Sequence, residues 1–324
     1  MNRSVYCLLF LISFVSAEWA EARQQSDQKS DQAVSSAVEK QDADKQTRAK
    51  ARAEKQRQKK KVADEMAHFL RIRRDAKRSP VAMETSVTRY EGVNEKGEPV
   101  SVDLIGVVHI GEKTYYEQLN KVFENYDAML YELVAPEGTV IPKGGRVDSG
   151  ASANPLVALQ VGMKSMLELD FQLDHIDYTK DNFVHADMSP KEFAESMKRN
   201  EESFFKMAMK AIGQSMGQQS SGQDAKMLAA ILSGSAAKRR AVMAEQMQDL
   251  ESGMVIFEGR DGSTIIDFRN AKAMDILKRE IAAGNKKLAL FYGAGHLPDM
   301  QRRLQSEFQM KRAGQYWLEA WKLK

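Results

Sequence analysis

Short apolar segments alternate with amphipathic ones along most of the C-terminal part of the chain. Residues 102–108 and 127–131 form two apolar runs short enough to be buried strands. Between them, residues 113–126 carry apolar side chains at the spacing of one helical face. A strand, a helix and a strand in that order predict a βαβ unit with parallel strands. We therefore expect an α/β domain over residues 79–324, built on a central, mostly parallel sheet flanked by helices.

The remaining pattern extends this sheet in both directions. Residues 83–90 and 99–108 predict two strands joined by a turn at 94–97. A helix is expected over 271–283, leading into an apolar strand that ends near residue 292, and residues 315–321 predict a final strand.

A methionine-rich helical insertion is expected between these strands. Ser189 and Glu192 flank Pro190 and Lys191 as a capping box, which marks a helix start. Residues 190–252 then have mostly helical character and contain many methionines, whose spacing favours core packing over a ligand-binding set.

The first 17 residues have the pattern of a secretory signal. Arg3 supplies a positive start, residues 5–15 are mostly apolar, and Ala17 ends a small-residue cleavage site. We expect cleavage, and hence a periplasmic or secreted protein; an uncleaved anchor is the alternative. Cys7 is the single cysteine, so no intramolecular disulfide can form.

Residues 18–78 predict a charged, low-complexity linker, disordered or partly helical. Residues 18–44 carry three basic and seven acidic side chains, whereas residues 45–61 carry nine basic and one acidic. Such composition buries too little apolar surface to fold alone. Because the chain is expected to be exported and the basic block has no interleaved aromatic residue, we expect no nucleic acid partner. A solvated spacer is the simpler interpretation, and an anionic cell-envelope surface is the alternative partner for residues 45–61.

Candidate chemistry gathers where the predicted strands end. Gly106 and His109 close the first apolar run, and Gly293 and His296 close the run before residue 293, each pair spaced as Gly-x-x-His. Glu132 ends the apolar run between them. The carboxyl ends of parallel strands share one edge of a sheet, where ligands bind. We therefore expect His109, Glu132 and His296 to share one site, with Asp187 or His185 completing the pocket.

Two imidazoles and a carboxylate support two kinds of chemistry. They are an ordinary ligand set for a catalytic divalent metal with an open position for water. The same residues can act without metal as general acid and base. If the three side chains do not meet, the two Gly-x-x-His segments are only turns at strand ends.

Other signatures fit their surroundings less well. Residues 213–217 match the Gly-x-Ser-x-Gly pattern of serine hydrolases, but they follow a helical segment instead of a strand. Residues 293–295 lack the third glycine of a dinucleotide-binding turn. The sequence contains no His-Glu-x-x-His motif and no Walker loop.

The motifs together resemble the TraB/PrgY/GumN superfamily, which includes the TIKI metalloproteases and is related to ChaN and erythromycin esterase-like folds. The resemblance covers residues 80–324 and rests on Gly106–His109, Tyr131–Glu132, Ile266–Asn270 and Gly293–His296, in that order. It implies that His109, Glu132 and His296 are metal-binding or catalytic. It also maps Arg269 and Asn270 onto an Arg-Asn motif, in which the arginine holds a substrate carboxylate or oxyanion.

Three functions follow as hypotheses. The first is an exported metal-dependent hydrolase, such as a peptidase, using a divalent ion of the Zn, Mn or Co class at His109, Glu132 and His296. The second is a non-catalytic protein that binds a peptide or small ligand in the same cleft. The third is a metal-free, esterase-like enzyme. Arg269 has a structural alternative too, an ion pair inside the fold.

Overall fold

The computed structural model describes residues 68–136, 138–145, 166–199, 229–230, 232–257 and 266–324, which belong to one compact unit, Met66–Lys324. The predicted signal segment, residues 18–67 of the predicted linker and the Gly-x-Ser-x-Gly stretch at 213–217 lie outside the described residues.

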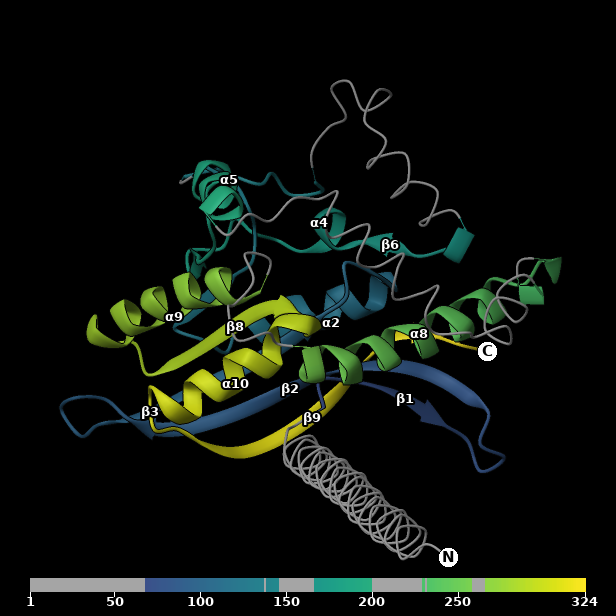
Figure 1. Ribbon diagram of the computed structural model, residues 1–324, viewed down its shortest axis with the longest axis horizontal. Helices are drawn as coiled ribbons and strands as arrows, with labels where there is room; N and C mark the ends of the chain where they lie inside the picture. The colour runs from purple at the N-terminus through teal and green to yellow at the C-terminus, as the bar shows by residue number, and fades with distance from the viewer. Residues whose placement is uncertain (1–67, 137, 146–165, 200–228, 231, 258–265) are drawn as a thin grey trace, which may run out of the picture. The chain divides into compact units, whose positions relative to one another are not determined.

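A seven-stranded mixed sheet forms the centre of the described part (Figure 1). Its strand order is β1-β2-β3-β8-β5-β7, and β9 pairs with β2. The bounds are β1 Leu70–Arg74, β2 Pro80–Val93, β3 Pro99–Val107, β5 Ala128–Tyr131, β7 Phe183–His185, β8 Lys287–Gly293 and β9 Lys311–Lys322.

The parallel part of the sheet consists of β3, β8, β5 and β7, whereas β1, β2 and β9 pair antiparallel. The α/β prediction is therefore confirmed in a mixed form, with the predicted hairpin as β2 and β3. The central strands are buried on both faces because helices cover both, and this explains their continuous apolar runs.

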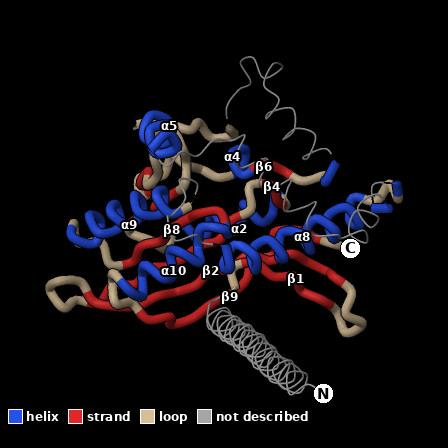
Figure 2. The backbone as a smooth tube through the Cα atoms, in the orientation of Figure 1, coloured by secondary structure: helices blue, strands red, loops and turns tan. Residues whose placement is uncertain are grey.

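Helices pack on both faces of the sheet (Figure 2). Helix α2, Lys113–Phe123, places the ring of Phe123 4.7 Å from that of Phe291. Residues Ile105 and Phe291 are register partners, as are Gly106 and Tyr292, so the two pairs face opposite sides. Helix α10, Leu297–Ser306, lies on the Gly106 side, where Leu297 packs against that glycine, and helix α9, Asp267–Ala282, packs beside α10.

The predicted capping box is present at the start of α5, Pro190–Arg199. The Ser189 backbone N–H donates to Glu192 Oε2 at 2.8 Å, and the Glu192 N–H donates to Ser189 Oγ at 3.2 Å. Helix α8, Ala236–Phe257, also belongs to the methionine-rich insertion. Residues 200–228 of that insertion lie outside the described part.

Two of the differences from the expected boundaries change which element carries a residue. Strand β1 lies inside the stretch assigned to the linker, so the fold begins before residue 79; its apolar residues Leu70 and Ile72 are buried and alternate with arginines. Helix α9 begins at Asp267, so Arg269 and Asn270 are in its first turn instead of ahead of it. Of the helices described, none has both the length and the apolarity needed to cross a membrane.

Candidate active site

Side-chain hydrogen bonds fix the backbone that carries His109. The strand β3 ends at Val107, just before this histidine. Tyr115 and Tyr116 of α2 donate to the carbonyls of Gly106 and Val108 at 3.1 and 3.0 Å, and Trp321 donates to the carbonyl of Ile110 at 2.6 Å. Three buried donors therefore hold the turn, while His109 itself remains exposed.

His109, Glu132 and His296 meet at Gly293. A methyl group placed on this glycine would lie 3.3 Å from Glu132 Oε2, 3.7 Å from His109 Nε2 and 3.9 Å from His296 Cδ2. The parallel order β3-β8-β5 produces this convergence, because the three strands end at the same edge. The glycine therefore leaves room for about one methyl group among these three side chains.

Glu132 is ionised although it is buried. Burial alone raises the pKa of a carboxyl, but the neighbouring His296, His109 and Arg269 outweigh it and hold the pKa of Glu132 well below its usual range. Its Oε2 accepts from the Gly293 N–H at 2.7 Å, and its Oε1 accepts from Arg269 at 2.6 Å. The site therefore contains a fixed negative charge at its centre.

Arg269 bridges two buried carboxylates. Its Nε and Nη2 donate to the two oxygens of Asp187 at 2.9 and 2.5 Å, and Nη2 also donates to Glu132. Its Nη1 lies 3.4 Å from His296 Nε2. Burial lowers the pKa of this guanidinium, but Asp187 and Glu132 raise it above its ordinary value. The structural alternative for Arg269, an ion pair within the fold, is therefore present at the edge of the candidate site.

Asn270 positions His296 instead of facing outward for substrate. Its Nδ2 donates to the His296 carbonyl at 3.0 Å and to Asp299 Oδ2 at 2.8 Å. Its Oδ1 must then accept the proton of His296 Nδ1, 2.7 Å away. The ring of His296 consequently keeps Nε2 for the site.

Gln172 is a member of the site that the sequence did not indicate. It follows the strand β6, Asp170–Phe171, and its Oε1 lies 2.9 Å from His109 Nδ1. Its segment has no periodic pattern and no motif, so only the fold brings it to His109. A buried glutamine beside a histidine would have been the signal, but burial is not visible in the sequence.

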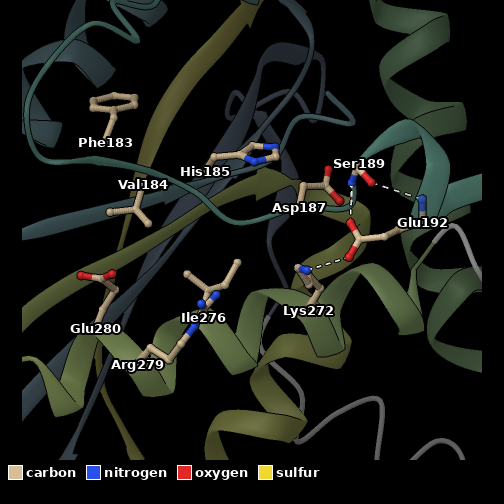
Figure 3. A pocket seen from close by; sticks show the side chains of 10 residues that line it. All are labelled: Phe183, Val184, His185, Asp187, Ser189, Glu192, Lys272, Ile276, Arg279 and Glu280. Atoms are coloured by element: carbon tan, nitrogen blue, oxygen red, sulfur yellow. Dashed lines mark hydrogen bonds and ion pairs between the residues drawn. The ribbon is translucent and has the colours of Figure 1, made fainter. Parts of the chain in front are cut away.

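A cavity of about 680 Å³ adjoins the site at the free side of β7 (Figure 3). Phe183, Val184 and His185 all line it, and because successive side chains alternate between the faces of a strand, the cavity reaches around the strand edge. Across it lie Lys272 and Arg279 of α9. His185 contributes its ring to this wall, while its Nε2 donates to the carbonyl of Leu133 at 2.6 Å.

The predicted metal does not fit the side chains as they lie. The residue types are suitable. In both histidines Nδ1 faces an amide oxygen, so Nε2 is the nitrogen that could bind a metal. However, the Arg269 guanidinium contacts Glu132 Oε1 and lies near His296 Nε2, which places a positive charge where the cation would bind. Within the described ranges, no group of three His, Cys, Asp or Glu residues is arranged to hold a metal ion. Metal binding stays a prediction.

Comparisons with known proteins add no family to this geometry. No protein-family model, no curated protein and no solved structure matches the chain. The resemblance to the TraB/PrgY/GumN superfamily therefore rests on the motifs alone.

Proposed function

We propose that the cluster around Gly293 is the active site of a hydrolase that works by general acid–base catalysis on an ester or amide bond. The single observation that supports this most is the convergence of His109 Nε2 and the ionised Glu132 at an unfilled point beside His296. An exposed imidazole next to a buried, charged carboxylate is a suitable general base, because the carboxylate stabilises the imidazolium that forms.

The proposed reaction uses His109 in both of its steps. Nε2 of His109 takes a proton from water, and the resulting hydroxide attacks the carbonyl carbon of the substrate. The same nitrogen then returns the proton to the leaving oxygen or nitrogen as its bond to carbon breaks. Glu132 stays ionised throughout and balances the imidazolium charge. Arg269 and Asp187 fix Glu132, so we assign them a positioning role in place of direct substrate contact.

A metal-dependent hydrolase is the second candidate. It is favoured by two histidines whose Nδ1 atoms each face an amide oxygen, with His296 Nε2 3.4 Å from Glu132 Oε1 and His109 Nε2 beside Gly293. His109, Glu132 and His296 would hold the ion, which would lower the pKa of a bound water. Arg269 would have to release Glu132 for this to happen.

The test combines elemental analysis with a turnover assay. Wild type and His296→Ala are purified without added chelator, analysed for Zn, Mn and Co, and assayed on p-nitrophenyl esters and unstructured peptides. We expect turnover that survives chelation and is lost in His109→Ala. Stoichiometric metal in wild type only, with activity restored by that metal, would favour the second candidate. Absence of turnover from all substrates, with tight binding of one of them, would favour a binding protein instead.

We also propose that the enzyme acts outside the cytoplasm. The basic start, the short apolar run and the small residues up to Ala17 support export, and residues 45–61 supply a basic segment for an anionic envelope surface. Intact mass of the exported protein tests this: removal of residues 1–17 is expected, and a full-length mass would mean that the segment is an anchor.

A further inference from the structure

Gln172 and His109 lie opposite each other through backbone pairing. The strand β4, Ile110–Gly111, pairs antiparallel with β6, with Ile110 facing Phe171. Continuing that register by one residue places His109 opposite Gln172, and the Gln172 N–H indeed donates to the His109 carbonyl at 2.9 Å. The backbone therefore holds both residues before their side chains interact.

The side chain of Gln172 is oriented from its other end. Its Nε2 donates to the hydroxyl of Tyr178 at 2.7 Å, which leaves Oε1 toward His109 Nδ1. Gln172 is only 6% exposed, and Tyr178 is packed against the rings of Tyr131 and Phe183. An amide oxygen accepts and cannot donate, so the nitrogen of His109 that faces it must carry the proton.

We propose that Gln172 is a positioning residue that fixes His109 as the Nδ1–H tautomer, so that the lone pair of Nε2 faces Gly293 and Glu132. The inference rests on the proposed function, because a general base needs its lone pair at the reacting water. The same device recurs at His296, where Asn270 of α9 presents its Oδ1. Two amides from separate segments thus orient two histidines of one site in the same way.

A neutral amide suits this role. A carboxylate at this position would also orient the ring, but it would add a third negative charge near Glu132 and Asp187. An amide oxygen selects the tautomer without adding charge to a site in which Arg269 already faces two carboxylates. In the observed orientation the amide nitrogen donates to Tyr178 and the amide oxygen faces His109.

Nitrogen NMR of the imidazoles tests the tautomer without any substrate. The chain has 5 histidines, and the spectra are recorded near pH 8, about 1.5 units above the ordinary imidazole pKa. We expect His109 and His296 as Nδ1–H tautomers. His185 donates from Nε2 to a carbonyl, so it supplies an internal reference of the opposite tautomer.

Substitution then separates positioning from packing. Gln172→Leu removes the acceptor at similar volume, and we expect His109 to lose its fixed tautomer while His296 keeps its own. Gln172→Glu restores an acceptor oxygen and should restore the Nδ1–H signal. Tyr178→Phe, which leaves Gln172 in place, should give a mixture of the two His109 tautomers because the amide can then turn. This variant provides the test if Gln172→Leu does not fold. In turnover, kcat of Gln172→Leu should fall by about 10–100-fold with KM nearly unchanged.

Two results would overturn the proposal: an Nε2–H tautomer of His109 in wild type, which would mean that the amide presents nitrogen, or an unchanged tautomer in Gln172→Leu. A tautomer that behaves as expected in a protein without any turnover would instead contradict the hydrolase proposal and leave the role of Gln172 in orienting the ring intact.

Discussion

At the scale of single residues, the site depends on the buried ion pairs of Arg269 and on the absence of a side chain at Gly293. Asp187 is 2% exposed, Arg269 8% and His296 5%, so these groups have lost nearly all of their hydration. Removing one partner from such a group leaves an uncompensated buried charge, which costs more than the intact pair contributes. The residues that hold the site should therefore be sensitive in stability as well as in activity.

Arg269→Met should lower the free energy of unfolding by about 3–5 kcal/mol, because Asp187 and Glu132 both lose their cation. Urea unfolding measures the loss. Arg279→Met is the matched control, since Arg279 is an exposed arginine of the same helix and should change stability by no more than about 0.5 kcal/mol. Equal changes in the free energy of unfolding for the two substitutions would show that the ion pairs of Arg269 with Asp187 and Glu132 do not stabilise the fold.

Gly293→Ala should reduce turnover with little effect on the stability of the fold. The backbone at Gly293 has φ −49° and ψ 135°, which any residue adopts, so strain is not expected. The added methyl would occupy the meeting point of His109, Glu132 and His296. We expect turnover to fall at least about tenfold and stability to change by only about 1 kcal/mol, since one methyl overpacks a partly open space.

The matched control for that substitution is Gly314→Ala in β9, where an added Cβ meets no atom within 4 Å. It should leave turnover unchanged. Full turnover in Gly293→Ala would place the reacting atoms elsewhere and remove the main support for the proposed site.

At the scale of elements, the sequence predicted the strand ends better than the segments that complete them. Apolar runs closed by Gly-x-x-His marked β3 and β8, and hence His109 and His296, because strand burial and turn chemistry are both local. Gln172 and the pairing of Arg269 with Asp187 depend on how the segment before α5 crosses the sheet edge, which no periodicity records. Strand β1 was predictable in principle, since Leu70 and Ile72 alternate with arginines. It was assigned to the linker because it is as highly charged as the residues before it.

Truncation at two points tests the corrected boundary. A chain beginning at Met66 should unfold within a few degrees of one beginning at residue 18. A chain beginning at Ser79 loses Phe69, Leu70 and Ile72, which are 0%, 3% and 9% exposed. At about 1.5–3 kcal/mol for each buried side chain, its free energy of unfolding should fall by at least about 4 kcal/mol. Thermal and urea unfolding compare the three chains. Equal stability of all three would mean that β1 does not contribute to the folded domain and belongs to the linker.

At the scale of the whole molecule, the buried acids make global stability depend on pH. Glu132 contacts Arg269 as a carboxylate, and its pKa is held well below the ordinary value by His296, His109 and Arg269 against the opposing effect of burial. Glu192, at the start of α5, behaves similarly: bonds from Lys272 and Ser189 lower its pKa to about 2. Both carboxyls are therefore more acidic in the folded chain than in the unfolded one.

This difference predicts how the molecule unfolds in acid. A carboxyl with a depressed folded pKa contributes its stability in full above the unfolded pKa, about 4.3 for Glu, and loses it as the pH falls toward the folded value. We expect the free energy of unfolding of wild type to be nearly constant above about pH 5 and to decrease steeply below about pH 4. Glu132→Gln keeps the shape and removes the titrating group, so it should be less stable near neutral pH but should show a shallower decrease in acid. Urea unfolding between neutral pH and about pH 2.5 measures both slopes, with Glu192→Gln as a control for an acid outside the site. Parallel slopes for wild type and Glu132→Gln would mean that Glu132 is not held ionised, and the fixed negative charge assigned to the site would then be wrong.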